Sequence, residues 1–430
     1  MTTRPARFIS RLTQNTLALV LAGGRGSRLG VLTDWRTKPA VPFGGKFRII
    51  DFTLSNCLNS GINHICVLTQ YKSHSLIQHL LQGWNSLNSQ RGQFLDILPA
   101  QQWLDDESWY QGTADAVFQS LDIVEGYDPE YILILAGDHI YTMDYGEMLA
   151  QHVENNADLT IACNTVPLAD AHNFGIMRVD DLFRIIDFDE KPEHPKALPN
   201  DPESALASMG IYIFSTEYLR TQLIADANDS ASEHDFGNNI IPKALEQGHH
   251  LHAYQFHNPN KGKAHYWRDV GTIDALFQTN LEIVSPTPPL DVYDPDWPIY
   301  TYQPQLPPAH FIGDHGESRI GNSIASGGCI INRSMLNNAV LFSNVRICEN
   351  CELENAVIMP GCEIGENSRL KNVFIDNLCV IPPNTVIGED REKDEKRFPV
   401  TEGGVVVVNR RMLGQGLQYM PGILQETMKS

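Results

Sequence analysis

The C-terminal third of the chain carries apolar residues at a fixed interval of six. A helical period of 3.6 residues or a strand period of 2 does not produce this pattern. A period of six is typical of a parallel β-helix, in which each turn stacks its apolar residue on that of the turn before. The series consists of Cys329, Met335, Leu341, Ile347, Leu353 and Met359, and a parallel series consists of Ile324, Ile330, Leu336 and Phe342.

The series then slips by one residue at Ile364 and Leu370, and slips again at Ile375. We therefore predict a left-handed parallel β-helix of hexapeptide repeats over residues 313–430. The apolar run 405–408 is expected to cap this solenoid. Residues 286–312 are rich in proline, which cannot join a β-ladder, and are expected to form a linker.

Residues 1–285 alternate short apolar runs with helical or loop segments. This alternation predicts a Rossmann-like α/β domain with a mixed, mainly parallel sheet. Ligands in such sheets bind beyond the carboxyl ends of the strands. The expected strands are 16–21, 64–69, 131–135, 159–163, 184–188 and 210–214.

The composition excludes several classes of protein. The chain has 430 residues, a net charge of -20 and a pI of about 5.1, which argues against binding to nucleic acid or to an anionic membrane. No segment approaches the roughly 20 apolar residues of a membrane span. The eight cysteines are scattered, and the one Cys-x-x-Cys has no second ligand pair for zinc. We expect a cytoplasmic protein with reduced thiols.

A glycine-rich segment follows the first expected strand and indicates a site for a polyphosphate. Glycines between a strand and a helix let the backbone N–H groups approach a phosphate. Three cations lie in the same segment: Arg25, Arg28 and Lys38. The glycines of this segment are Gly23, Gly24 and Gly26.

Two other phosphate-binding motifs do not fit this segment. No Gly-Lys-Ser/Thr follows the glycines at the spacing of a P-loop. The dinucleotide fingerprint also fails, because Gly24, Gly26 and Gly30 are spaced one residue too far apart. Asp51 could mimic the ribose-binding acid of that fold, but the arginines argue against a close approach of the backbone.

Further polar residues follow other expected strands. Asp138 follows the run 131–135, and Asp269 lies in a second motif; two carboxylates of this kind could share Mg²⁺. Lys191 could bind a phosphate monoester, although an exposed lysine alone is unremarkable. Gly112 precedes a helical stretch that could bind an anion or a base. Ser208 and Tyr212 could bind sugar hydroxyl groups or could simply pack.

Together these motifs resemble the glucose-1-phosphate adenylyltransferase family over essentially the whole chain. The general part of the resemblance is the sugar-nucleotide pyrophosphorylase signature, which consists of residues 23–29 with Lys38-Pro39. The specific part consists of the segments 43–52, 54–57, 109–116, 136–141 and 266–272.

The resemblance implies that ATP and α-D-glucose 1-phosphate react to give ADP-glucose and pyrophosphate, the first committed step of glycogen biosynthesis. In this reaction the sugar phosphate attacks the α-phosphorus in line. The implied catalytic residues are Arg28, Lys38 and Asp138, with Mg²⁺ held by Asp138 and Asp269. The implied substrate-binding residues are Gly23, Gly24, Arg25, Gln70, Tyr110, Gly112, Gly175, Glu190, Lys191, Ser208 and Tyr212.

The resemblance also implies a homotetramer and binding of phosphorylated effectors. Enterobacterial relatives have a lysine at the position of Trp35, an arginine at Gln111 and paired arginines at Glu125-Gly126. The loss of these cations predicts weakened responses to fructose 1,6-bisphosphate and AMP. Phosphate contacts that remain for an effector are Arg36, Arg48, Arg410 and Arg411.

Three other functions fit parts of the sequence. The general signature also fits a pyrophosphorylase that uses UTP, dTTP or GTP. A hexapeptide acyltransferase would act through a histidine in the solenoid, but no histidine lies beyond His315. A non-catalytic regulatory subunit would not need Lys38, Asp138 and Lys191 together.

Overall fold

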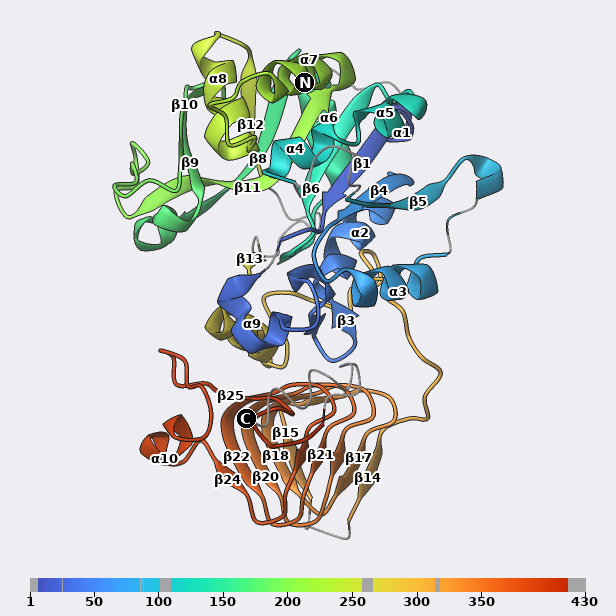
Figure 1. Cartoon of the computed structure of the whole chain (residues 1–430), viewed down its shortest axis with the longest axis vertical. Helices are drawn as coiled ribbons and strands as arrows, with labels where there is room; N and C mark the ends of the chain where they lie inside the picture. Colours follow the sequence, from blue (N-terminus) through green and yellow to red (C-terminus); the bar gives the residue numbers. More distant parts are fainter. Residues whose placement is uncertain are drawn as a thin grey trace. The chain divides into compact units, whose positions relative to one another are not determined.

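The computed structural model describes residues 7–24, 26–85, 87, 89–100, 110–256, 266–313 and 318–416 (Figure 1). The chain forms two compact units, and each unit is built from separated stretches of sequence. The first unit contains residues 1–25, 50–267 and 295–300; the second contains residues 26–49, 268–294 and 301–430. The linear boundaries at residues 285 and 312 stay predictions.

A parallel arrangement of strands forms one half of the large sheet in the first unit. Strand β1 (Thr16–Leu21) pairs in parallel with β4 (His64–Thr69) and β6 (Tyr131–Ala136), and β4 pairs in parallel with β5 (Phe94–Pro99). Residues 16–20 are all buried. A strand that is buried on both faces needs a continuous apolar run, and this is the pattern that the sequence shows here.

The other half of the sheet is mainly antiparallel. Strand β11 (Ser204–Ser215) pairs antiparallel with β6, β8 (Leu159–Pro167) and β9 (Gly175–Val179). Strand β10 (Ile185–Glu190) pairs antiparallel with β9, and β12 (Leu251–Gln255) pairs in parallel with β8. The fold class expected from the sequence, a mixed sheet followed by a parallel β-helix, is therefore confirmed.

Helices pack against this sheet. Helix α6 (Tyr145–Glu154) packs against β8 and β12, and α7 (Thr216–Ala227) packs against β6 and β11. The remaining elements that begin before residue 270 are α1 (Phe8–Gln14), η1 (Ser27–Thr33), η2 (Lys38–Ala40), β2 (Pro42–Phe43), β3 (Phe47–Arg48), α2 (Ile49–Asn59), α3 (His74–Gly83), η3 (Ser89–Arg91), α4 (Thr113–Phe118), α5 (Leu121–Gly126), β7 (His139–Tyr141), η4 (Leu168–Asn173), η5 (Phe236–Ile240), α8 (Ile241–Glu246) and β13 (Trp267–Asp269).

The second unit contains the parallel β-helix, whose stacked strands are visible in Figure 1. One face consists, in stacking order, of β14 (His310–Ile312), β17 (Ile330–Asn332), β19 (Arg346–Ile347), β21 (Glu363–Ile364) and β23 (Val380–Ile381). A second sheet contains β15 (Arg319–Gly321), β16 (Ile324–Ala325), β18 (Met335–Leu341), β20 (Glu352–Ile358), β22 (Arg369–Ile375), β24 (Val386–Ile387) and β25 (Val406–Val408).

The length of one turn explains the slips in the sequence pattern. Asn338 bonds to Asn355 of the next turn, 17 residues later. Asn338 divides β18 into two sides of the solenoid, which pair with β15 and β16, and the first sheet forms the third side. The three sides of one turn share 17 residues, so one of the three intervals between core residues has five residues instead of six. The buried residues Leu336, Leu341, Ile347 and Leu353 show this spacing of five, six and six. Strand β25 pairs with β22 and closes the last turn, as expected for 405–408.

Met335, a member of the first predicted apolar series, points away from the core of the solenoid. Met335 is 40% exposed, whereas the adjacent Leu336 is 2% exposed and fills the core position. Two apolar residues stand side by side here, and successive side chains of a strand point to opposite faces. The period of six selects both residues, one in each series, and does not tell which of them faces the core.

Asparagines form the tight corners of the solenoid. Asn338, Asn355 and Asn372 have φ angles of 56°, 48° and 49°, a left-handed conformation that asparagine tolerates better than most residues. Their side chains form a ladder, with Asn338 donating to Asn355 at 2.7 Å and Asn355 donating to Asn372 at 2.9 Å. The ladder satisfies side-chain amides that would otherwise lose their partners at a partly buried corner.

The segment 26–49 packs within the same unit as the solenoid. Gly44 N donates to Asn280 Oδ1 of α9 (Ile273–Glu282) at 2.9 Å, and Ser326 Oγ donates to the carbonyl oxygen of Gly45 at 2.8 Å. The rings of Phe277 on α9 and Phe374 on β22 lie 6.5 Å apart. The remaining helix, α10 (Arg391–Glu395), is capped at its N-terminus by the side chain of Asp390.

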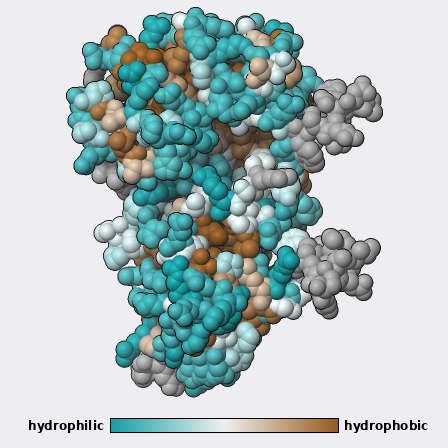
Figure 2. All heavy atoms as spheres, turned by 60° about the vertical axis from the view of Figure 1, so that its left-hand side comes forward, coloured by the Kyte–Doolittle hydropathy of each residue, from teal (hydrophilic) through white to brown (hydrophobic). Residues whose placement is uncertain are grey.

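Polar residues cover most of the face shown in Figure 2, with apolar residues in scattered patches. Among the described residues, the helices are all too short or too polar to cross a membrane. The eight cysteines form no disulfide, and only Cys348 is not buried.

The packing of the solenoid predicts different effects for two neighbouring substitutions. Leu336→Ala removes a buried side chain and is expected to destabilise the solenoid by about 2–5 kcal/mol. Met335→Ala is the matched control, because its exposed side chain leaves little cavity, and it is expected to cost about 0.5 kcal/mol or less. Chemical denaturation of both variants measures this difference; equal losses would contradict the assigned register.

Candidate active site

The glycine-rich segment begins where β1 ends, beside the end of β4. Ala22 N donates to the carbonyl oxygen of Leu68 at 2.9 Å. A Cβ atom on Gly23 would lie 3.1 Å from the Cβ atom of Gln70, so that these two predicted substrate-binding residues are neighbours. A Cβ atom on Gly24 would meet nothing within 4 Å, and this backbone is open to a ligand. Arg25 lies outside the described residues.

The second part of the signature lies in the other unit, where two cations share one carboxylate. Lys38 Nζ lies 2.6 Å from Asp269 Oδ1, and Arg28 Nη2 lies 3.6 Å from Asp269 Oδ2. The side chain of Lys38 is 6% exposed, whereas that of Arg28 is 59% exposed. A buried ammonium needs a counter-charge, and Asp269 supplies it. Arg28 and Lys38 of the glycine-rich signature and Asp269 of a second motif thus form one cluster.

Glycines make this cluster sterically possible. Gly26 has φ 61°, and a Cβ atom there would lie 2.9 Å from the Cβ atom of Lys38. A Cβ atom on Gly271 would lie 2.8 Å from Arg28 Nη2 and 3.1 Å from both carboxylate oxygens of Asp269. The glycines of both motifs therefore let charged side chains approach closely.

Asp138 follows β6 at the carboxyl end of the parallel strands. Gly137 N donates to the carbonyl oxygen of Leu21 at 3.1 Å, and a Cβ atom on Gly137 would lie 3.2 Å from that oxygen. This close approach fixes the turn that carries Asp138. The Asp138 carboxylate is 34% exposed and lies 3.6 Å from Nε2 of His139. A partly exposed carboxylate at this edge of the sheet can ligate a hard cation.

Glu190 ends strand β10 beside two glycines, and Lys191 follows it. Lys191 Nζ lies 2.6 Å from Glu190 Oε1, and the Lys191 side chain is 63% exposed. A Cβ atom on Gly175 would lie 2.7 Å from Glu190 Oε2, and a Cβ atom on Gly237 would lie 2.5 Å from the same oxygen. Glu190 is thus held between two backbones, while the Lys191 ammonium faces solvent.

A break in the ladder of β11 places Ser208 and Tyr212. The register between β11 and β8 shifts between these two residues, and Gly210 between them has φ 67°. Such a bulge redirects side chains locally. Burial raises the pKa of Tyr212, and the neighbouring carboxylates of Glu190 and Asp235 raise this pKa further. Tyr212 therefore keeps its hydroxyl proton and can donate a hydrogen bond.

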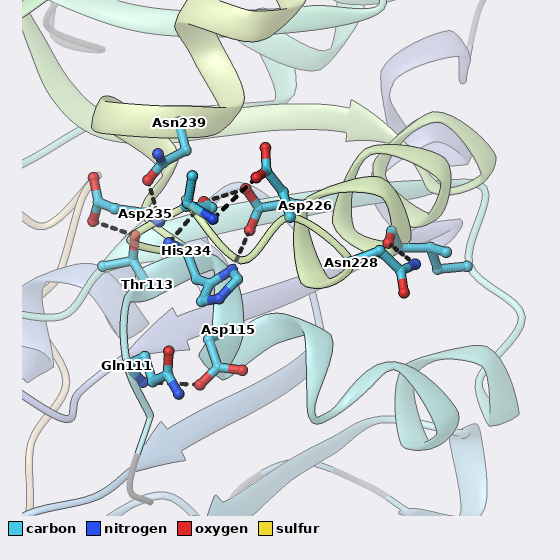
Figure 3. Close-up of polar contacts among 12 residues, drawn as sticks. Gln111, Thr113, Asp115, Asp226, Asn228, His234, Asp235 and Asn239 are labelled. Atoms are coloured by element: carbon cyan, nitrogen blue, oxygen red, sulfur yellow. Dashed lines mark hydrogen bonds and ion pairs between the residues drawn. The ribbon is translucent and has the colours of Figure 1, made fainter.

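The turn at Gly112 packs against residues 233–236 (Figure 3). Thr113 Oγ1 donates to Asp235 Oδ2 at 2.8 Å, and Ala114 N donates to the carbonyl oxygen of His234 at 2.8 Å. A Cβ atom on Gly112 would collide with the carbonyl oxygens of Glu233 and His234. Burial raises the pKa of the adjacent Tyr110.

Sequence reasoning missed the contribution of Asp235 and Phe236. The ring of Phe236 lies 5.6 Å from that of Tyr212, and Asp235 also caps η5 through Gly237 N and Asn238 N. An aspartate before Phe-Gly-Asn indicates only a helix cap when the sequence is considered alone. The contact with Tyr212 appears only in the folded chain.

Comparisons with known proteins cover nearly the whole chain. A nucleotidyl transferase family model matches residues 17–285, and a model named GlmU-like, C-terminal hexapeptide matches residues 307–408. A protein of Nitrosococcus oceani is 54% identical over 96% of this chain and 98% of its own length. A protein of Saccharophagus degradans is 56% identical over 95% of this chain and 97% of its own length. Both relatives are named glucose-1-phosphate adenylyltransferase.

The chain belongs to the glucose-1-phosphate adenylyltransferase family. A Methylococcus capsulatus protein with the same name is 55% identical over 96% of this chain. The nucleotidyltransferase class expected from the sequence is confirmed.

The four arginines that were expected to contact effectors lie in different surroundings. Arg36 is buried, and its Nη2 lies 2.6 Å from Asp376 Oδ1. Arg48 ends β3 and is half-buried. Arg410 and Arg411 follow β25; Arg410 is half-buried and Arg411 is exposed.

The packing at Gly112 predicts that an added methyl group there is costly. Gly112→Ala is expected to destabilise the chain by roughly 1–3 kcal/mol, because two backbone carbonyl groups cannot easily move away. Gly126→Ala is the matched control, since a Cβ atom on Gly126 would meet nothing within 4 Å. Chemical denaturation measures both; a Gly112→Ala variant as stable as the control would contradict this packing.

Proposed function

We propose that this chain transfers the adenylyl group of ATP to α-D-glucose 1-phosphate, giving ADP-glucose and pyrophosphate. The observation that carries the proposal is the identity of 51–56% over almost the whole chain to relatives named for this reaction. The cluster of Lys38, Arg28 and Asp269 supports it, because two cations around one carboxylate suit a polyphosphate that leaves with its charge.

Lys38 and Arg28 are proposed to neutralise the departing pyrophosphate. The attacking oxygen of the sugar phosphate forms a bond to the α-phosphorus while the bond to the β-phosphate oxygen breaks. The charge that develops on that oxygen needs cations already in place, since preorganised groups need no rearrangement during the step. Lys38 is held in place by Asp269, and Arg28, which is more exposed, lies beside the same carboxylate.

Asp138 and Asp269 are proposed to hold Mg²⁺. Both present carboxylate oxygens, the donor type that this hard cation takes, and Asp138 is partly exposed. A bound Mg²⁺ supplies positive charge to the triphosphate. Asp269 is also proposed to orient Lys38, whose ammonium group lies closer to the carboxylate than the guanidinium group of Arg28 does.

The sugar phosphate is proposed to bind at Glu190, Lys191, Ser208 and Tyr212, near Gly175. The Lys191 ammonium, which faces solvent and is steadied by Glu190, suits a phosphate monoester. The hydroxyl groups of Tyr212 and Ser208 suit hydrogen bonds to sugar hydroxyl groups.

The nucleotide is proposed to contact Gly23, Gly24, Gln70, Tyr110 and Gly112. Gly24 leaves its backbone open, and the Gly112 turn is rigid because it is bonded to residues 234–236. Arg25 is part of the same proposal on the strength of the motif alone.

The direct test is the release of pyrophosphate from different nucleotides with glucose 1-phosphate and Mg²⁺. We expect ATP to be preferred over UTP, dTTP and GTP by at least about tenfold in kcat/KM. EDTA is expected to abolish the reaction, and excess Mg²⁺ to restore it. A preference for another nucleotide would move the chain to the alternative pyrophosphorylase function, and no release with any nucleotide would contradict both.

Lys191→Gln tests the sugar phosphate site. We expect the KM for glucose 1-phosphate to rise by roughly 10- to 100-fold with a small change in kcat, because uniform binding is lost. Lys196→Gln is the matched control: Lys196 lies in the same segment but pairs with Asp187 and Asp189. Equal changes in the two variants would contradict the role of Lys191.

Weak control by effectors is part of the proposal. Trp35 offers no charge, and Glu125, for which the resemblance implies an arginine in enterobacterial relatives, pairs with Arg220 Nε at 2.8 Å. We expect fructose 1,6-bisphosphate to raise the rate less than about threefold, since the anion loses charged partners. Activation of tenfold or more in a titration would contradict this expectation.

We also place the enzyme in the cytoplasm, as a homotetramer in the synthesis of glycogen. Analytical ultracentrifugation measures the assembly state.

A further inference from the structure

A buried ion pair joins the signature segment to the solenoid within the second unit. Arg36 Nη2 lies 2.6 Å from Asp376 Oδ1, and Arg36 Nη1 donates to Asn377 Oδ1 at 3.2 Å. The side chains of Arg36 and Asp376 are 9% and 8% exposed. The two partners are 340 residues apart in sequence.

The backbone of Asp376, the acid of this pair, is held by hydrogen bonds within the solenoid. Asp376 N donates to the carbonyl oxygen of Val408 at 2.8 Å, and Cys362 Sγ donates to the carbonyl oxygen of Asp376 at 3.0 Å. Asp376 follows β22, the strand that pairs with β25 in the last turn. The backbone that carries this carboxylate is therefore held on both sides by other residues of the solenoid.

The segment from Arg36 to Lys38 is tightly packed and has little room to adjust when Arg36 is displaced. Thr37 is fully buried and Lys38 is 5% exposed. Pro39 has a fixed φ angle and restricts the backbone of the residue before it. A Cβ atom on Gly26 would lie only 2.9 Å from the Cβ atom of Lys38, so the two backbones approach closely. A displacement of Arg36 is thus passed on to the Lys38 ammonium.

A buried ion pair contributes little net stability compared with apolar residues of the same volume. It does impose one arrangement, because breaking it leaves a charge without a partner in the interior. A contact of this kind suits a role in placing a neighbouring group better than a role in stabilising the fold.

We propose that Arg36 and Asp376 are positioning residues for adenylyl transfer: their ion pair anchors the Lys38 segment to the last turns of the solenoid. This inference rests on the proposed function, in which Lys38 neutralises pyrophosphate. It assigns the guanidinium of Arg36, which the sequence suggested as a phosphate contact, to a carboxylate of the same chain.

The test is a double-mutant cycle between Asp376→Asn and Lys38→Gln, with kcat/KM for ATP as the readout. In the parent, Asp376→Asn is expected to lower kcat/KM by about 10- to 100-fold, since misplacement by about 1 Å costs this much. In the Lys38→Gln background, the same change is expected to cost less than about threefold, because the group that it misplaces is gone.

Arg369→Gln is the control. Arg369 forms a bidentate pair with Glu389 on the same solenoid, with both N···O distances 2.8 Å, but the pair is exposed and far in sequence from the signature. This variant is expected to keep the parent kcat/KM. Thermal unfolding of each variant reports whether it is folded, and Arg36→Lys replaces Asp376→Asn in the cycle if the latter does not fold.

The outcomes separate the inference from the function on which it rests. Equal losses from Asp376→Asn in both backgrounds indicate a merely structural role and overturn the inference, as does a parent-like rate in Asp376→Asn. A parent that forms no ADP-glucose from ATP overturns the proposed function, and the inference falls with it.

Discussion

The ion pair between Lys38 and Asp269 is the interaction on which the rest of the site depends. It joins two segments 231 residues apart, with Lys38 Nζ 2.6 Å from the carboxylate. A lysine as buried as this one keeps its charge only beside a counter-charge. The glycines at 26 and 271 have their function here, since a side chain at either position would push the charged groups apart. When a polyphosphate binds, its oxygens can share the ammonium group with Asp269.

The solenoid contributes to this arrangement through packing. No histidine lies beyond His315, where an acyltransferase of this fold would carry one, and the core of the solenoid consists of stacked apolar residues. The segment that carries Lys38 belongs to the same unit, where Gly45, Arg36 and α9 contact solenoid residues. The solenoid therefore supports the cationic half of the signature through direct contacts. Its turns of 17 residues are joined at one corner by a ladder of asparagine side chains.

Much of the fold could be predicted from the sequence because the apolar runs of the strands and the interval of six in the solenoid are local features of the chain. Strands β1 and β4 begin and end at the expected residues, since each is a short apolar run between turn residues. The solenoid followed from the period of six. The period of six could not tell which of Met335 and Leu336 faces the core, because a strand with two adjacent apolar residues can face either way. Long-range contacts were also out of reach: no local pattern indicates that Gly237 adjoins Glu190 or that Arg36 meets Asp376.

The most direct test of this account is the reverse reaction, in which pyrophosphate attacks ADP-glucose. The account assigns Lys38 to the pyrophosphate and Lys191 to the sugar phosphate. Lys38→Gln is therefore predicted to lower kcat/KM for pyrophosphate by about 100-fold or more, in line with the loss of one preorganised charge partner. The KM for ADP-glucose is predicted to change by less than about threefold. A Lys38→Gln variant with parent-like kinetics for pyrophosphate, or with its whole defect in the KM for ADP-glucose, would contradict the account.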